Sequence, residues 1–308
     1  MRPKTDNELK QIYERGYPKM KKVISLLLVV LLVTGCFAGC AKNVTIECTC
    51  DCNSQIDNAK YSKLKANGKS GVDCSNMPSD KAGILKLYND VANATKATPN
   101  QKLSKNDPGA KTDITALSTN GSPAGDGTME QVKGLVKSFA PAGVTNDYNF
   151  ANGVDSAVKD EDGNDSTTTE VLPVSGQDYM SALTDADISD ATIEKLEDGY
   201  WKLSISVNPC EVEFTDPENN PDTPQAKFTG VMKSSDLLKS FGPAKITYAK
   251  INYKESTITA IIDPESGYLV QLITHMDYGI DATGSLVVEL QGSINVKSDI
   301  IYNWTEIG

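Results

Sequence analysis

The C-terminal third of the chain shows its most regular pattern, an alternation of hydrophobic and polar residues with the period of a β-strand. Along residues 268–280 one set of alternate side chains is mostly polar, and the other is apolar at Val270, Leu272, Met276, Tyr278 and Ile280. Similar runs separated by polar turns predict five successive strands, at residues 246–253, 257–262, 268–280, 286–290 and 300–304. We therefore expect an antiparallel meander with one face in the core.

Shorter strands are expected before this meander. Residues 191–196 and 200–207 flank an Asp-Gly turn and alternate in the same way, which predicts a hairpin. Residues 210–214 then predict one further strand.

Hydrophobic residues at helical spacing predict a helix that begins near residue 80. Ser79 or Asp80 can cap it, and its buried stripe would be Ile84, Leu87, Tyr88, Val91 and Thr95. A second helix is expected over residues 128–139 and a short third one over residues 234–241. Residues 97–127 are rich in Asn, Asp, Gly, Pro, Ser and Thr, which predicts a loop.

These elements predict the fold class α+β, with a curved antiparallel β-meander packed on one face by two or three helices. Residues 61–175 would be a helical and loop-rich part and residues 176–308 an antiparallel β-rich part, the two forming one domain. Residues 40–60 are polar and would form a flexible tether before that domain.

Residues 20–39 have the layout of a cleaved lipoprotein signal peptide. Lys21 and Lys22 provide the positive region, an apolar run follows at residues 23–33, and small residues then lead into cysteine. That run is too short for a membrane span, which needs ~20 apolar residues. Residues 1–19 are polar and carry three carboxylates, so we expect them to be untranslated leader, with translation starting at the methionine of residue 20.

Two cysteines compete as the site of lipid attachment. Cys36 and Cys40 both follow small residues that resemble a lipobox, and we prefer Cys40 because its Ala-Gly-Cys ending is the commoner form, with Cys36 as the alternative. A diacylglyceryl group with palmitate-type chains buries two chains at ~0.8 kcal/mol per CH₂, which is enough for stable anchoring. We therefore expect an extracytoplasmic protein anchored to the cell membrane by its N-terminal lipid.

Charge and composition narrow the function classes. The residues before Cys40 carry a net charge of +4, so the exported part carries −15, given −11 for the whole chain. This acidity argues against nucleic acid as a partner. The exported part has no arginine and a single histidine, His275, so it lacks the usual phosphate-binding and proton-transfer groups. We expect a protein without enzymatic activity or cofactor.

The cysteines after the lipid site raise the questions of metal binding and disulfides. Cys48, Cys50 and Cys52 lack the second cysteine pair or the histidines of a structural zinc site, so we expect no metal there. Together with Cys74 and Cys210 they make an odd number, so at least one stays free or pairs between molecules. A bridge between Cys74 and Cys210 is one option.

Other candidate chemistry is weak. The acidic run at residues 160–165 does not fit the EF-hand template and is interpreted as a solvated turn. His275 and Asp277 would share one side of a strand, but no nucleophile motif accompanies them, so His275 is interpreted as a surface residue. A carboxylate-based glycoside hydrolase needs neither Arg nor His, but only Trp201 and Trp304 could supply a large stacking surface for sugar.

Two resemblances bear on the class of protein. The lipobox, the helix from Tyr88 and Asn89 to Lys96, and the Asp-Pro-Glu-Ser-Gly turn of the terminal meander resemble clostridial surface lipoproteins of uncharacterised function. The expected shape, a curved sheet with helices on its concave side, is similar to the lipid-carrying half-barrels of the LolA and LppX type. The first resemblance implies a membrane-anchored surface protein, and the second implies an apolar ligand between sheet and helices.

Three functions follow as expectations. The first is a membrane-anchored, non-enzymatic binding or structural module of the cell surface. The second is a carrier of lipid or another apolar ligand, and the third is a carboxylate-based glycoside hydrolase. The ligand-binding residues, any surface partner and the oligomeric state stay open.

Overall fold

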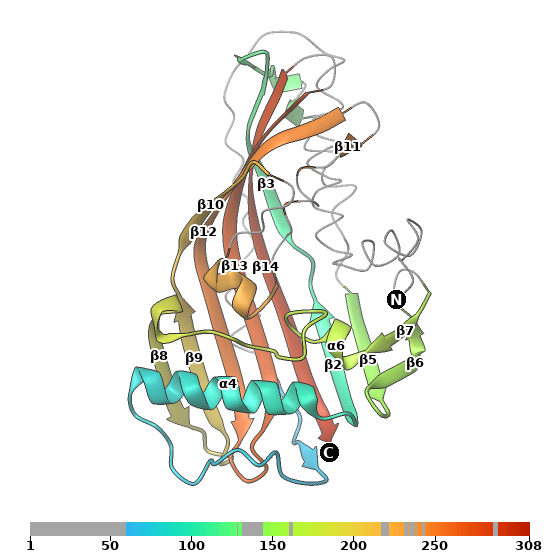
Figure 1. Ribbon diagram of the computed structural model, residues 1–308, viewed down its shortest axis with the longest axis vertical. Coiled ribbons are helices and arrows are strands. Elements are labelled where there is room, and N and C mark those ends of the chain that lie inside the picture. The colour runs from blue at the N-terminus through green and yellow to red at the C-terminus, as the bar shows by residue number, and fades with distance from the viewer. Residues whose placement is uncertain are drawn as a thin grey trace, which may run out of the picture.

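The computed structural model describes residues 60–127, 129–130, 144–159, 163–216, 222–230, 234, 238, 240–241, 244–285 and 289–308. Most of this part is one large antiparallel sheet, with few helices (Figure 1). The α+β class expected from the sequence is therefore confirmed at this coarse level. The end of the sheet near the C-terminus is called the lower end below, as it stands in Figure 1.

Three very long strands form the centre of the sheet: β12 (Ala244–Asp263), β13 (Tyr268–Ser285) and β14 (Glu289–Ile307). At ~3.3 Å per residue, such strands approach 60 Å in length. They pair in sequence order, as the predicted meander requires.

The prediction of separate strands at 246–253 and 257–262 is wrong, because both lie in β12. A register shift between Tyr253 and Glu255 marks the point where β10 (Cys210–Phe214) gives way to β9 (Trp201–Val207) as the neighbouring strand. The bulge lets the ladder continue through polar residues. In the same way, residues 289–290 and 300–304 belong to the single strand β14.

The expected hairpin and the strand after it are confirmed. β8 (Ile188–Lys195) pairs with β9, and β8 forms one edge of the sheet. The alternation of β9 is followed closely by its burial, since every second residue from Trp201 to Val207 is buried.

The loop expected at residues 97–127 is wrong, and the part at 61–175 contains more strand than predicted. β2 (Gln101–Asp107) and β3 (Lys111–Thr119) both pair with β14, and β5 (Val144–Phe150) extends the sheet beyond β2. These strands carry few apolar residues, so their hydrophobic pattern is weak. Pairing with the long strand β14 supplies the stability that their own sequence does not indicate.

The remaining described strands and helices are short. Strands β1 (Lys65–Ala66), β4 (Ser122–Pro123) and β11 (Ser240–Phe241) pair with β14, β3 and β12 respectively. A separate hairpin consists of β6 (Val154–Lys159) and β7 (Asp165–Thr167). The one-turn helix α6 (Thr168–Val171) and the 3₁₀ helices η1 (Asp185–Asp187) and η2 (Pro224–Lys227) lie in the connections.

The first predicted helix is confirmed as α4 (Lys81–Ala97). Asp80 caps it, since the backbone N–H of Gly83 donates to Asp80 Oδ1 at 2.8 Å, and the whole predicted stripe is buried. The helix contacts β8, β9 and β13. The second helix, expected over 128–139, lies outside the described residues apart from 129–130. The third, expected over 234–241, lies largely outside them, and its last two residues form β11 instead.

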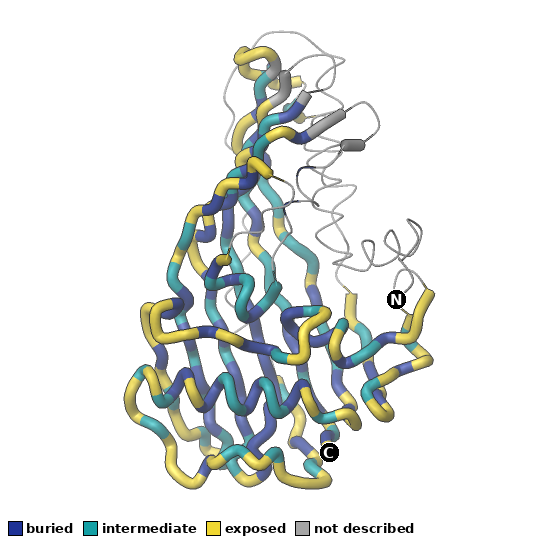
Figure 2. Tube along the Cα trace, viewed as in Figure 1, coloured by how far each residue is buried: buried dark blue, intermediate teal, exposed yellow. Residues whose placement is uncertain are grey.

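The main core lies between α4 and the lower half of the sheet. Its centre consists of residues with no exposed surface, which include Tyr88, Val91, Leu203, Leu272 and Trp304. Figure 2 shows that buried positions also continue along the central strands above α4. No helix in the described ranges is long and apolar enough to cross a membrane.

Candidate functional site

Several residues singled out in the sequence lie outside the described residues. They are the two candidate lipid sites Cys36 and Cys40, the tether cysteines Cys48, Cys50 and Cys52, and residues 160–162 of the acidic run. Cys74 and Cys210 are both free thiols, so the bridge considered between them is not formed. Burial raises the pKa of each thiol, which keeps both in the weakly nucleophilic neutral form.

His275 pairs with a partner that its own strand does not provide. Its Nδ1 lies 2.6 Å from Asp299 Oδ1 on β14, while Asp277 pairs with Lys297 at 3.0 Å. The hydrogen bond to Asp299 raises the pKa of His275. The side chain is only 14% exposed, so the surface position expected for it is wrong, and its carboxylate partner is Asp299 rather than Asp277.

The two tryptophans belong to the core. Trp201 is 7% exposed and Trp304 is fully buried, with its Nε1 donating to Gln101 Oε1 at 2.8 Å. Neither ring offers a face to a sugar. Within the described ranges, no three or more His, Cys, Asp or Glu side chains lie close enough to hold a metal ion.

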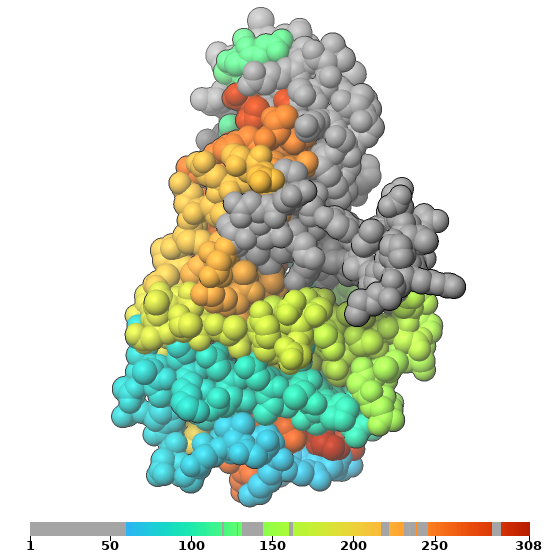
Figure 3. Space-filling model, viewed as in Figure 1, coloured from blue at the N-terminus to red at the C-terminus, as the bar shows by residue number. Residues whose placement is uncertain are grey.

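Residues 172–187, between α6 and β8, form a strap that crosses the sheet above α4 (Figures 1 and 3). Polar side chains of α4 hold the backbone of this strap. Asn93 accepts from the N–H groups of Met180 and Ser181 at 2.8 and 2.9 Å and donates to the carbonyl of Ser181 at 2.9 Å. Asn89 donates to the carbonyl of Leu183 at 2.8 Å. Both asparagines lie on the helix that carries the resemblance to surface lipoproteins. Their hydrogen bonds to the strap give them a structural role.

Lys96 fixes the beginning of the strap from a buried position. It is 4% exposed, and its Nζ donates to the carbonyls of Pro173 and Val174 at 2.7 and 3.1 Å. Burial lowers the pKa of Lys96 to about 8, despite the opposing effect of Asp178. Val174 has a φ of 54°, which is strained for a β-branched residue. The lysine therefore holds a strained turn in place.

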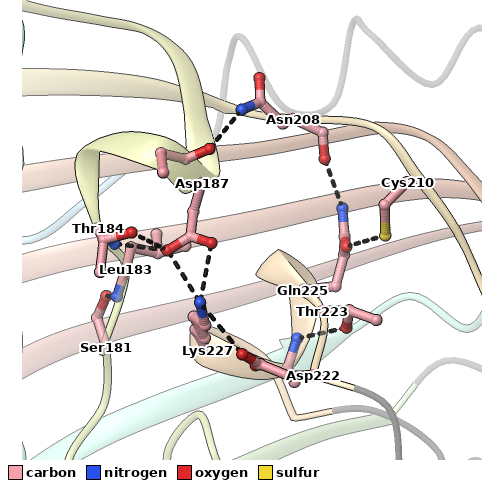
Figure 4. Close-up of polar contacts among 12 residues, drawn as sticks. Ser181, Leu183, Thr184, Asp187, Asn208, Cys210, Asp222, Thr223, Gln225 and Lys227 are labelled. Atoms are coloured by element: carbon pink, nitrogen blue, oxygen red, sulfur yellow. Dashed lines mark hydrogen bonds and ion pairs between the residues drawn. The ribbon is translucent and has the colours of Figure 1, made fainter.

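A buried ion pair links the other end of the strap to η2 (Figure 4). Lys227 Nζ lies 2.9 and 3.2 Å from the carboxylate oxygens of Asp187, which is 6% exposed. Thr184 donates to the same carboxylate through its N–H at 2.7 Å and its hydroxyl at 2.6 Å. Burial alone would raise the pKa of Asp187, but the hydrogen bonds from Thr184 and Lys227 hold it below its usual value.

The neighbouring network fixes η2 against the sheet. Gln225 is fully buried, and its Nε2 donates to the carbonyl of Asn208 at 3.2 Å and to Ser256 Oγ at 3.3 Å. Cys210 Sγ donates to Gln225 Oε1 at 3.1 Å (Figure 4). Strap and η2 together therefore form a polar band across the sheet. The band offers hydrogen bonds and two ion pairs, because Lys227 Nζ also lies 3.7 Å from Asp222 Oδ2. Burial keeps the thiol of Cys210 neutral, so the described residues of the band position chain segments and include no activated nucleophile.

Above this band the same face of the sheet is again apolar. Buried residues align across five strands, in a row made of Val212, Ile251, Ile280, Ile294 and Ile114. A neighbouring row consists of Phe214, Ala249, Ala282, Gly292 and Leu117. None of these residues belongs to the hydrophobic cluster around α4. We call the two rows the upper apolar face.

A polar groove of about 690 Å³ lies at the lower end, between α4 and the loop at residues 70–78. Figure 3 shows these two segments side by side on one face of the molecule. The polar residues that line the groove are Ser70, Asp73, Asn76, Lys86, Asp90 and Asn93. Its volume falls in the range of small-molecule sites, ~300–1,000 Å³.

Sequence reasoning missed the polar band and the groove. Thr184 and Asp187 do form a local helix-start pattern, which could have indicated the 3₁₀ turn η1. The partner of Asp187 is forty residues away on η2, and the groove joins a loop to the outer side of α4. No local pattern reports such contacts between distant segments.

Comparison with protein-family models, with curated proteins and with solved structures finds no match. The resemblances to clostridial surface lipoproteins and to lipid-carrying half-barrels therefore stay predictions.

Proposed function

We propose that the protein is a non-enzymatic binding module, anchored to the outside of the cell membrane through a lipid on Cys40. The signal-like segment at residues 20–39 supports the anchor, and the acidic composition of the part from Cys40 onward, which has no arginine, supports the absence of catalysis. The observation that carries the binding role is the stiff architecture of the described part. Three long paired strands, crossed by α4 and the strap, hold a formed groove and a separate apolar face in fixed positions.

The finer architecture belongs to the same proposal. Helices would cover one face of a curved sheet, with α4 over its lower half, where Tyr88 and Leu272 share one core. The described part begins at Lys60; the next residue, Tyr61, donates to Asp198 in the turn between β8 and β9 at 2.7 Å, and Lys65 of β1 pairs with Glu306 near the C-terminus, at the lower end. The tether would therefore join the domain at its lower end, and the upper end would point away from the membrane.

Replacing Cys40 with serine is expected to release the protein from the membrane. Serine cannot form the thioether to diacylglycerol, so the two-chain anchor is lost. Fractionation of cells into membrane and soluble material, followed by detection of the protein, measures the change. Cys36→Ser is the matched control and should leave the protein in the membrane fraction. Release by Cys36→Ser alone would move the lipid to Cys36, and retention of both variants would contradict a lipid anchor.

The upper apolar face favours a second candidate function, the carriage of lipid or another apolar ligand. Ligand sites are concave and largely apolar, and this face is separated from the main core by the polar band. The small residues Ala249, Ala282 and Gly292 stand in the middle of one row, between Phe214 and Leu117. A chain-like apolar ligand would lie along such a row.

Native mass spectrometry of protein made from Ala41 onward tests the carrier function. A carrier should show a bound lipid mass, although this form has no lipid of its own. Ala282→Leu, which fills the middle of the row, should reduce that species. Thr283→Leu adds a similar side chain at the next position of the same strand, on the opposite face, and should not. The absence of any bound mass would count against a carrier.

A further inference from the structure

We propose that the groove between α4 and residues 70–78 binds a neutral, linear oligosaccharide. The inference rests on the proposed role as a binding module and names the ligand class for one site. The groove follows α4 from Gly83 to Asn93, ten residues or ~15 Å of helix, so it suits an extended ligand.

Two close backbone approaches fix the walls of the groove. A Cβ atom on Gly83 would lie 3.1 Å from Pro78 Cβ, and one on Gly267 would lie 2.4 Å from Ser70 Oγ. Glycine inside a helix costs ~1 kcal/mol relative to alanine, so Gly83 is explained by this contact rather than by helix stability. The N–H of Ser70 also donates to the carbonyl of Ser266 at 2.8 Å. The groove is therefore formed before a ligand arrives, which lowers the entropic cost of binding.

The charges of the lining disfavour an anionic ligand. Lys86 Nζ lies 2.5 Å from Asp90 Oδ2, so these two charges neutralise each other. Asp73 remains, and hydrogen bonds from Ser75 lower its pKa, which keeps it ionised. The exported chain carries −15, which repels anionic polymers over the whole surface.

The polar groups of the lining match hydroxyl groups. Asp73 Oδ1 accepts from the N–H of Ser75 at 3.0 Å, Asn76 Nδ2 donates to Ser75 Oγ at 3.2 Å, and Ser70 Oγ accepts from the N–H of Val72 at 3.1 Å. A carboxylate, an amide and a hydroxyl each have more than one donor or acceptor position, so all three side chains keep the capacity for a further hydrogen bond. A sugar hydroxyl can donate or accept a hydrogen bond, so each of these groups can find a partner on an oligosaccharide. Between them Val72 and Pro78, which are half-buried, present aliphatic surface for the C–H groups of a ring. Neither tryptophan contributes to this lining, because both are buried elsewhere.

Calorimetric titration of the mature protein with cellohexaose, chitohexaose, maltohexaose and xylohexaose tests the proposal. At least one probe should bind saturably, and Asp73→Ala or Asn76→Ala should each weaken binding about fivefold, the effect of one hydrogen bond. Both residues are exposed, so thermal unfolding should be unchanged. Glu213→Ala, an exposed carboxylate on β10, is the control and should bind like the unchanged protein.

Failure of all four probes to bind would overturn the proposal, as would equal binding by the Asp73 and Asn76 variants. Binding of a pentalysine peptide that depends on Asp73, with no oligosaccharide bound, would also overturn it and make the groove a site for cationic peptides. None of these results would affect membrane release by Cys40→Ser. Failure of the oligosaccharide proposal can therefore be distinguished from failure of the proposed lipid anchor.

Discussion

Replacing Asp187 with alanine is expected to lower the free energy of unfolding by about 2–4 kcal/mol. The change leaves Lys227 without its nearest carboxylate and removes two hydrogen bonds from Thr184. Breaking a buried ion pair by removing one partner costs ~3–5 kcal/mol, and a somewhat smaller loss is expected here because the Lys227 side chain is 24% exposed and keeps Asp222 at 3.7 Å. Urea unfolding followed by circular dichroism measures the loss.

The pH dependence of this effect has a definite sign. The pKa of Asp187 is lowered in the folded protein, so its contribution is present above the unfolded value, ~3.9, and is lost as the pH falls through the folded value. The difference between the parent and Asp187→Asn should therefore shrink in acid. Asp190→Ala, an exposed carboxylate on β8, should change stability by less than ~0.5 kcal/mol. An equally small loss in Asp187→Ala would show that the band does not hold the strap.

Replacing Lys96 with methionine is expected to remove a rise in stability at alkaline pH. The folded protein releases the Lys96 proton near pH 8, whereas an unfolded chain keeps it to about 10.5. Between these values the unfolded state binds more protons, so the free energy of unfolding rises with pH, by up to about 3 kcal/mol for this shift. Methionine has a similar length and no proton, so the rise should disappear.

Chemical unfolding at pH 7, 8, 9 and 10 measures this effect as the difference between the parent and Lys96→Met. Tyrosine ionisation affects both proteins alike and cancels in that difference. Lys86→Met removes an exposed lysine from the same helix and is the matched control for the loss of a helix lysine. A difference between the parent and Lys96→Met that does not change with pH would contradict the lowered pKa of Lys96 and its buried contacts with Pro173 and Val174.

The central strands and α4 could be predicted because their signals are local. Alternation in β9 and β13 and the stripe on α4 repeat at the period of the element itself. Burial follows the pattern in β9 and α4, but residues 268–274 of β13 are buried on both faces, so the solvent-facing side expected for that part of the strand is wrong. β2 and β3 could not be predicted in the same way. Their side chains are mostly polar, and what makes them strands is β14, which lies almost two hundred residues away in the chain.

The band and the groove depend even more on distant contacts. Asn89 and Asn93 look like ordinary polar positions on a helix, and only the folded chain shows that they bind strap carbonyls and N–H groups. The sequence predicted that His275 lies on the mostly polar side of its strand, but its partner Asp299 comes from the neighbouring strand. The register between two strands decides which side chains pair, and the sequence of either strand alone does not determine that register.

Mass spectrometry of the N-terminal peptide of protein extracted from membranes tests the central claim, a lipid-anchored module outside the cell membrane. The account predicts a mature chain that begins at Cys40 and carries a diacylglyceryl group on its sulfur. A lipid-bearing chain that begins at Cys36 would correct only the site. An intact segment over residues 20–39, or an N-terminal cysteine without lipid in the membrane fraction, would contradict the account.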